Sequence, residues 1–177
     1  DLEHGEWELI DARPHPALRP HVVRYTGWFE RRTTPLQRRE LPSHYVPLII
    51  NFGAPTRVSH VADPTRWDTF ATFTTGAYDS YVLVETDGGA SGIQVDFTLL
   101  GARLFLDIAL DELTNRAIAL DDIVGGDAGM LAAALHDAPT WDARFDLLDR
   151  AIARRLEASH PVSREMLWTW NRLVDTG

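Results

Sequence analysis

Hydrophobic and polar residues alternate along much of the first hundred residues, a pattern typical of strands with one buried face. The clearest example is Val22–Arg31, where Val23, Tyr25, Gly27 and Phe29 alternate with Arg24, Thr26, Trp28 and Glu30. The mostly apolar run Val46–Phe52 predicts a strand buried on both sides. Shorter stretches predict further strands at Trp7–Ile10, Arg57–Val61 and Thr69–Thr74.

A tight turn is indicated between two further alternating runs. Ser80–Glu85 and Ile93–Thr98 are separated by a segment that contains Asp87-Gly88-Gly89. An Asp-Gly pair readily adopts the positive φ angles of hairpin turns. We therefore predict a β-hairpin over residues 80–98.

From Leu99 onward the spacing of apolar residues becomes helical. Asp111 is predicted to cap a short turn, and a second short segment, Asp121–Val124, stops at Gly125-Gly126. Three longer helices are predicted, each with a polar N-cap residue. They are Ala128–Leu135 after Asp127, Trp141–Ala158 after Thr140, and Arg164–Leu173 after Ser163.

Strands followed by helices indicate an α+β protein, with a small antiparallel barrel or sandwich over residues 1–126 and a helical region over residues 127–177. The helix 141–158 carries one apolar stripe that needs a covering surface, either the strands or a second copy of the chain. We expect this stripe to form a homodimer contact. Its members are Trp141, Phe145, Leu148, Ile152 and Leu156.

Composition removes several classes of function. The chain of 177 residues has no Cys, which excludes disulfides, thiolate metal sites and a cysteine nucleophile. No apolar run approaches the roughly 18 to 20 residues of a membrane span, and we expect no membrane partner. The start Asp1-Leu2-Glu3-His4 is unlike an export leader, so a cytoplasmic location is expected. All positive charges are Arg, which suggests a GC-rich bacterial source.

Charge argues against nucleic-acid binding by this part of the protein. Residues 1–60 carry eight Arg against seven acidic residues, whereas residues 61–177 carry nine Arg against nineteen. Phosphate backbones are bound by clustered Lys and Arg, which such an acidic chain lacks.

No pattern of catalytic or metal-binding residues stands out. The seven His are scattered without a His-x-His pair, the Gly-x-Ser-x-Gly pattern is absent, and the acidic pairs precede helices, where they favour the dipole. We therefore predict no metal, no cofactor and no catalytic residues. The strand half is instead rich in aromatic residues, which either fill the core or line a pocket for a small organic molecule. The predicted ligand-binding residues are Tyr25, Trp28, Glu30, Tyr45, Asn51 and Tyr81.

Several segments of the chain resemble a known family. They are Arg39–Ser43 leading into Val46–Gly53, Val95–Thr98 with Gly101–Leu106, Leu110–Arg116, Leu120–Gly125 and the helix 141–156. In this order they resemble the N-terminal domain of AraC-family transcriptional regulators, although Leu99 and Ala109 stand where that family usually has Pro.

The resemblance implies a cupin-like β-barrel that senses a small-molecule effector, with C-terminal helices that dimerise. It also implies a C-terminal DNA-binding domain with two helix-turn-helix motifs, which is not in this chain; Ser163–Val174 would be the connecting helix. The expected function is therefore effector sensing without enzymatic activity. The alternatives are a stand-alone cupin-like binding module, a metal-free enzyme, and a purely structural dimerisation domain with a filled barrel.

Overall fold

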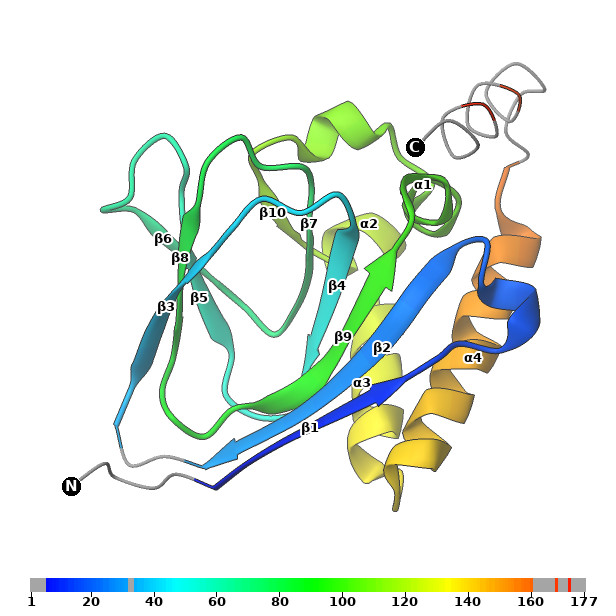
Figure 1. The fold of residues 1–177 in the computed structure, drawn as a ribbon, viewed down its shortest axis with the longest axis horizontal. Helices are drawn as coiled ribbons and strands as arrows, with labels where there is room; N and C mark the ends of the chain where they lie inside the picture. Colours follow the sequence, from blue (N-terminus) through cyan, green and yellow to red (C-terminus); the bar gives the residue numbers. More distant parts are fainter. Residues whose placement is uncertain (1–5, 32–33, 161–167, 169–171, 173–177) are drawn as a thin grey trace.

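The computed structural model describes residues 6–31 and 34–160, together with residues 168 and 172 (Figure 1). Within these residues the chain is strand-rich, with two antiparallel sheets and four α-helices. The predicted order of strands first and helices afterwards holds for nine of the ten described strands, because only β10 follows α1. Among the described strands no ladder joins the two sheets into one closed barrel.

The larger sheet, called here the large sheet, has six strands, and each neighbouring pair is antiparallel. In spatial order its strands are β1 (Glu6–Ala12), β2 (Val22–Arg31), β9 (Ser91–Phe97), β4 (Val46–Asn51), β7 (Thr72–Thr75) and β10 (Ala117–Ala119).

The four-stranded small sheet lies on one side of the large sheet (Figure 1). Its strands, in spatial order, are β3 (Leu36–Glu40), β8 (Val82–Thr86), β5 (Thr56–Ser59) and β6 (Trp67–Phe70). Neither β3 nor β10 was predicted from the sequence. Four of the five residues of β3 are exposed, and β10 is only three residues long, so neither shows an alternating pattern.

Two helices cover the opposite face of the large sheet, and two short ones lie nearer its upper end (Figure 1). The helices are α1 (Leu99–Leu106), α2 (Asp121–Val124), α3 (Asp127–Asp137) and α4 (Trp141–Ala158), with 3-10 turns at Pro16–Leu18 and Leu110–Leu113. One hydrophobic core joins the large sheet to α1, α3 and α4. The predicted division at residue 126 stays a prediction.

The predicted hairpin is wrong. Its two strands, β8 and β9, both exist, but β8 pairs with β3 and β5 while β9 pairs with β2 and β4. The segment around Gly88, whose φ is 94°, therefore carries the chain from one sheet to the other. A turn signal fixes the local bend of the chain, whereas strand pairing depends on the partners that bury each strand.

The single strand predicted at Thr69–Thr74 is also wrong. The chain forms β6 up to Phe70 and β7 from Thr72, and these strands belong to different sheets. The alternation of polar and apolar residues changes phase at Ala71, because Phe70 and Phe73 are three residues apart, and this is where the chain leaves one sheet for the other.

Helix caps were predicted with mixed success. Thr140 caps α4 as predicted, because its hydroxyl accepts a hydrogen bond from the Ala143 backbone N–H at 3.2 Å. Asp127 lies inside the first turn of α3, which follows Gly126, and Asp111 lies inside its 3-10 turn. Neither Asp is an N-cap. The predicted helix Arg164–Leu173 and its cap Ser163 lie outside the described residues, except for Trp168 and Arg172.

Candidate functional site

A cavity of about 450 Å³ lies between the two sheets. This volume falls within the range of small-molecule binding pockets. Because side chains alternate along a strand, each strand of the large sheet presents one set of residues to the helices and the other set to the cavity. The cavity is therefore built from every second residue of several strands.

The wall of the cavity on β2 and β9 is polar. Arg24, Thr26 and Glu30 of β2 line it, together with Gln94 and Asp96 of β9. The Asp96 carboxylate is almost fully buried and accepts hydrogen bonds from Arg24 Nε and Gln94 Nε2, each at 2.7 Å. The hydrogen bond and charge of Asp96 raise the pKa of the Arg24 guanidinium. This pairing compensates for the burial of the carboxylate.

The wall formed by the small sheet and β7 is mostly apolar. Val58 of β5, with Val82 and Val84 of β8, packs with Phe73 of β7 in a small hydrophobic cluster. All four line the cavity. A ligand in the cavity would thus meet an apolar surface on one side and hydrogen-bonding groups on the other.

The small sheet also contributes hydroxyl groups. Thr56 and Thr86 line the cavity, and both are buried. Thr56 donates a hydrogen bond to Asn51 Oδ1 at 3.2 Å, and Asn51 Nδ2 donates to the backbone carbonyl of Ala71 at 2.8 Å. Tyr78 lines the cavity too, and burial raises the pKa of its hydroxyl to about 12.

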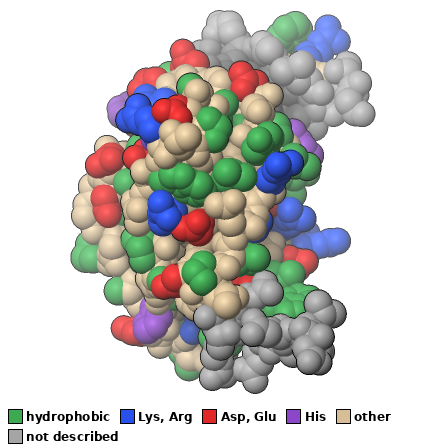
Figure 2. All heavy atoms as spheres, turned by 90° about the vertical axis from the view of Figure 1, so that its left-hand side faces the viewer, with side chains coloured by type: hydrophobic (Ala, Val, Ile, Leu, Met, Phe, Trp, Pro, Cys, Tyr) green, Lys and Arg blue, Asp and Glu red, His purple; other side chains and the backbone are tan. Residues whose placement is uncertain are grey.

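Several large apolar side chains stand exposed beside the cavity. Trp7 and Leu9 of the edge strand β1 and Leu41 after β3 all line it, and Trp7 is 71 % exposed. On the face of the molecule that carries the small sheet, hydrophobic side chains lie among Arg and acidic ones (Figure 2).

Three of the six predicted ligand-binding residues line the cavity: Trp28, Glu30 and Tyr45. The Trp28 indole lies against Gly92 of β9, where a Cβ would collide with the ring. The other three lie elsewhere. Tyr25 faces the helices, Asn51 lies behind Thr56, and Tyr81 is 41 % exposed beneath the Arg39 guanidinium.

Arg24, Asp96 and Thr86 were not predicted as cavity residues. The predicted faces of β2 agree with the structure from Arg24 to Trp28, whereas Phe29, predicted to share a face with Tyr25, lines the cavity. Candidates were chosen mainly for aromatic character, and Tyr25 was therefore taken from the helix-facing set. The polar residues of β2 that begin with Arg24 were the better indication of a cavity. When both faces of a sheet are covered, polar residues on it do not face solvent, so they indicate an internal polar space.

The structure places the predicted dimer stripe of α4 against the core of the large sheet. Phe145, Leu148 and Ile152 are buried in the core formed with the large sheet, and Trp141 and Leu156 pack against the same core. The ring of Trp141 lies over Gly27 of β2, which leaves no room for a Cβ there. Within the chain the core thus contacts all five side chains, and homodimer formation stays a prediction.

A hydrogen bond joins β2 to α4 directly. The Tyr25 hydroxyl donates to Asp149 Oδ1 at 2.8 Å, and the backbone N–H of His15 donates to the same carboxylate at 3.1 Å. Burial and the bond to Asp149 raise the pKa of the Tyr25 hydroxyl. The neighbours of Tyr25 along the strand, Arg24 and Thr26, line the cavity. Thus β2 contacts the cavity with one face and α4 with the other.

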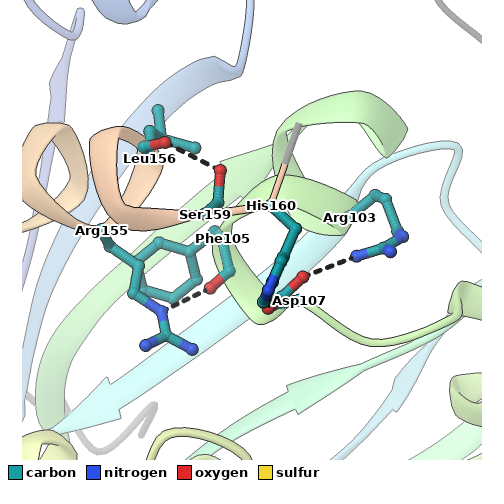
Figure 3. A network of polar contacts seen from close by, with 7 residues as sticks. All are labelled: Arg103, Phe105, Asp107, Arg155, Leu156, Ser159 and His160. Atoms are coloured by element: carbon teal, nitrogen blue, oxygen red, sulfur yellow. Dashed lines mark hydrogen bonds and ion pairs between the residues drawn. The ribbon is translucent and has the colours of Figure 1, made fainter. Parts of the chain in front are cut away.

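The end of α4 is tied to α1 by a second polar network (Figure 3). Arg155 Nε donates to the Phe105 carbonyl at 2.9 Å, and His160 Nδ1 lies 2.7 Å from Asp107 Oδ2. Arg103 contacts the other oxygen of Asp107 at 3.2 Å. The hydrogen bond from His160, followed by that from Arg103, lowers the pKa of the Asp107 carboxyl. These contacts hold the chain where it leaves α4.

Comparison with known families matches residues 11–119 to a domain of unknown function, DUF6597. This match covers more than half of the chain, so the protein belongs to the DUF6597 family. It includes the cavity-lining strands from β2 to β9 but only the last two residues of β1, and it ends before α3 and α4. No curated protein matches the chain. Among the described residues no helix is long and apolar enough to cross a membrane.

Proposed function

We propose that this chain is the effector-sensing domain of a bacterial transcription regulator of the AraC type. The segments that resemble that family include Val46–Gly53, which contains β4, and Val95–Thr98 with Gly101–Leu106, which contain the end of β9 and most of α1. These elements form one wall of the cavity and its junction with the helices. In this proposal the two sheets correspond to the cupin-like barrel of the family, and the effector occupies the cavity between them.

The observation that carries the proposal is the double role of β2. Arg24, Thr26 and Trp28 face the cavity, whereas Tyr25 is hydrogen-bonded to Asp149 of α4. A ligand that binds more tightly to one position of β2 favours the matching position of α4. A ligand shifts such an equilibrium only through a difference in its affinity for the two positions. We therefore propose that β2, which lies between the cavity and α4, couples ligand binding to the position of the helix.

The proposed regulator has no enzymatic activity and acts in the cytoplasm as a homodimer. Since the stripe of α4 is buried within the chain, the proposed dimer contact lies on another surface. DNA binding belongs to a C-terminal domain that follows the segment after α4.

The coding sequence beyond residue 177 tests the regulator assignment. We expect it to encode about 100 further residues, rich in Arg, with two helix-turn-helix patterns. A stop codon at that point contradicts the assignment and favours a stand-alone binding module.

The coupling is tested in the full-length gene product with Tyr25→Phe. This variant removes the hydroxyl bonded to Asp149 and leaves the cavity lining unchanged. We expect effector affinity, measured by calorimetry, to stay within about twofold, whereas the effect of the effector on DNA binding in a mobility-shift assay falls. An unchanged effector response contradicts coupling through this bond.

A further inference from the structure

One hydroxyl group in the cavity has no partner. Thr86, the last residue of β8, lines the cavity and is only 6 % exposed. Its Oγ1 is buried and makes no hydrogen bond to any described residue. Buried hydroxyls are normally paired, and leaving one unpaired is destabilising. A bound molecule that supplies a hydrogen-bonding atom at this point therefore gains an interaction that the empty protein lacks.

The register of the small sheet places a second hydroxyl beside the first. Arg57 pairs with Glu85 across β5 and β8, so that Thr56 lies opposite Thr86. The Thr56 hydroxyl already donates its proton to Asn51, which leaves it able to accept another hydrogen bond. Thr86 can either donate or accept. The two threonines together suit a ligand oxygen atom that can also donate or accept a hydrogen bond.

The surface beside these hydroxyls is apolar and uncharged. Besides the threonines, the two strands present only Val58, Val82 and Val84 to the cavity. A charged group placed against valine loses hydration without compensation. The cavity-lining guanidinium groups of Arg24 and Arg38 are already paired with Asp96 and Glu40. An anionic ligand group therefore gains less from this wall than an uncharged one.

We propose that the cavity binds an apolar small molecule that carries an uncharged hydroxyl or carbonyl oxygen, and that this oxygen pairs with Thr86. The inference rests on the proposed function, in that it takes the cavity as the ligand site, and it adds the chemical class of the ligand. The apolar body lies against Val58 and Val84, and the oxygen lies at the level of Thr56 and Thr86.

Three compounds that share a methylbenzene body test the proposal by isothermal calorimetry: p-cresol, toluene and p-toluate. They place a hydroxyl, a hydrogen atom or a carboxylate at the same ring position. We expect p-cresol to bind about three- to tenfold more tightly than toluene, the value of one neutral hydrogen bond, and p-toluate to bind most weakly. Absence of p-cresol binding, or tighter binding of p-toluate, overturns the proposal.

Thr86→Val removes the hydroxyl and keeps the branched shape. We expect the preference for p-cresol over toluene to fall below about twofold, with the affinity for toluene unchanged. Because the hydroxyl has no internal partner, the melting temperature should stay the same or rise. Thr69→Val, at an exposed position of β6 outside the cavity, is the matched control and should keep the full preference.

The outcomes separate this proposal from the proposed function. A p-cresol preference that survives Thr86→Val, or a melting temperature that falls by several degrees, overturns the assignment to Thr86 while the cavity remains the ligand site. If the preference depends on Thr86 but p-cresol leaves DNA binding by the full-length protein unchanged, the ligand class is supported and effector sensing is contradicted for this class.

Discussion

The two faces of the large sheet differ sharply, although the same strands supply both. The face toward the helices is filled, with Leu48, Ile93 and Val95 buried in one core with α4. The face toward the small sheet carries Arg24, Gln94 and Asp96 around a cavity of about 450 Å³. Close packing fixes the first face in one arrangement, whereas the second keeps space and hydrogen-bonding groups for another molecule. The packed core therefore lies on one face of the sheet, and the cavity lies on the other.

The largest effect is expected from a charge on the filled face. Leu148 of α4 is completely buried, so Leu148→Asp places an unpaired carboxylate in the core and removes an apolar side chain. We expect a loss of about 4 kcal/mol or more in the free energy of unfolding, which is enough to unfold many domains. Urea denaturation followed by circular dichroism measures it.

Arg150→Asp is the matched control, because it places the same carboxylate on the exposed face of α4. It should change stability by less than about 1 kcal/mol. If Leu148→Asp instead yielded a folded monomer from a dimer, the stripe would be an interface between chains, and the burial seen here would not describe the protein in solution.

A smaller loss is expected from Gly27→Ala. A Cβ at this position meets the ring of Trp141 at less than a normal contact distance, so the helix must shift or the ring must turn. Overpacking of this kind costs about 1 to 3 kcal/mol. Thermal denaturation measures the loss.

The double variant Gly27→Ala with Trp141→Ala isolates the contact between strand and helix. The alanine at position 27 should cost little once the ring is gone, so the two losses should not add. Strict additivity would mean that the ring does not lie over Gly27. Gly126→Ala is a suitable control, because a Cβ there meets no atom within 4 Å.

These effects also show what could be predicted from the sequence. The stripe of α4 and its cap Thr140 were predictable, because helical spacing and capping are properties of neighbouring residues. Which surface covers the stripe was not, because a sheet and a second helix bury apolar residues equally well. In the structure the stripe packs on the large sheet, where Gly27 has no side chain and leaves room for the indole of Trp141.

The cavity was only partly predictable for a related reason. Alternation along β2 separated the two faces, but it did not tell which face meets helices and which meets a second sheet. The pairing of β8 with β3 and β5 joins segments distant in the sequence, and no local turn signal encodes it. Thr86 could not be recognised as an unpaired hydroxyl before its surroundings were known.

A moderate effect is expected where β2 meets α4. Tyr25→Phe removes the hydroxyl that donates to Asp149 while retaining the ring stacked on Phe145. A hydrogen bond to a charged group contributes about 1.5 to 3 kcal/mol, and we expect a loss toward the lower end because His15 still donates to the carboxylate. Chemical denaturation of the chain measures it. An unchanged free energy of unfolding would show that the bond does not hold the two elements together.

The smallest effect is expected at the end of α4, where His160 and Asp107 meet on an exposed surface. The folded chain lowers the pKa of Asp107 below its ordinary 3.8. The carboxylate form is therefore favoured by folding, and its contribution to stability is present above about pH 4 and is lost as the pH falls through the folded pKa. His160→Ala should raise this pKa toward 3.8 and flatten the dependence of stability on pH in the acid range. Carboxyl chemical shifts followed by NMR titration measure the pKa directly.

Arg103→Gln should shift the pKa of Asp107 in the same direction but less, since Arg103 is the weaker of the two hydrogen-bonding causes. An Asp107 pKa that is indifferent to His160 but moves with Arg103 would place the anchor within α1 alone, and α4 would then be free to move at its end.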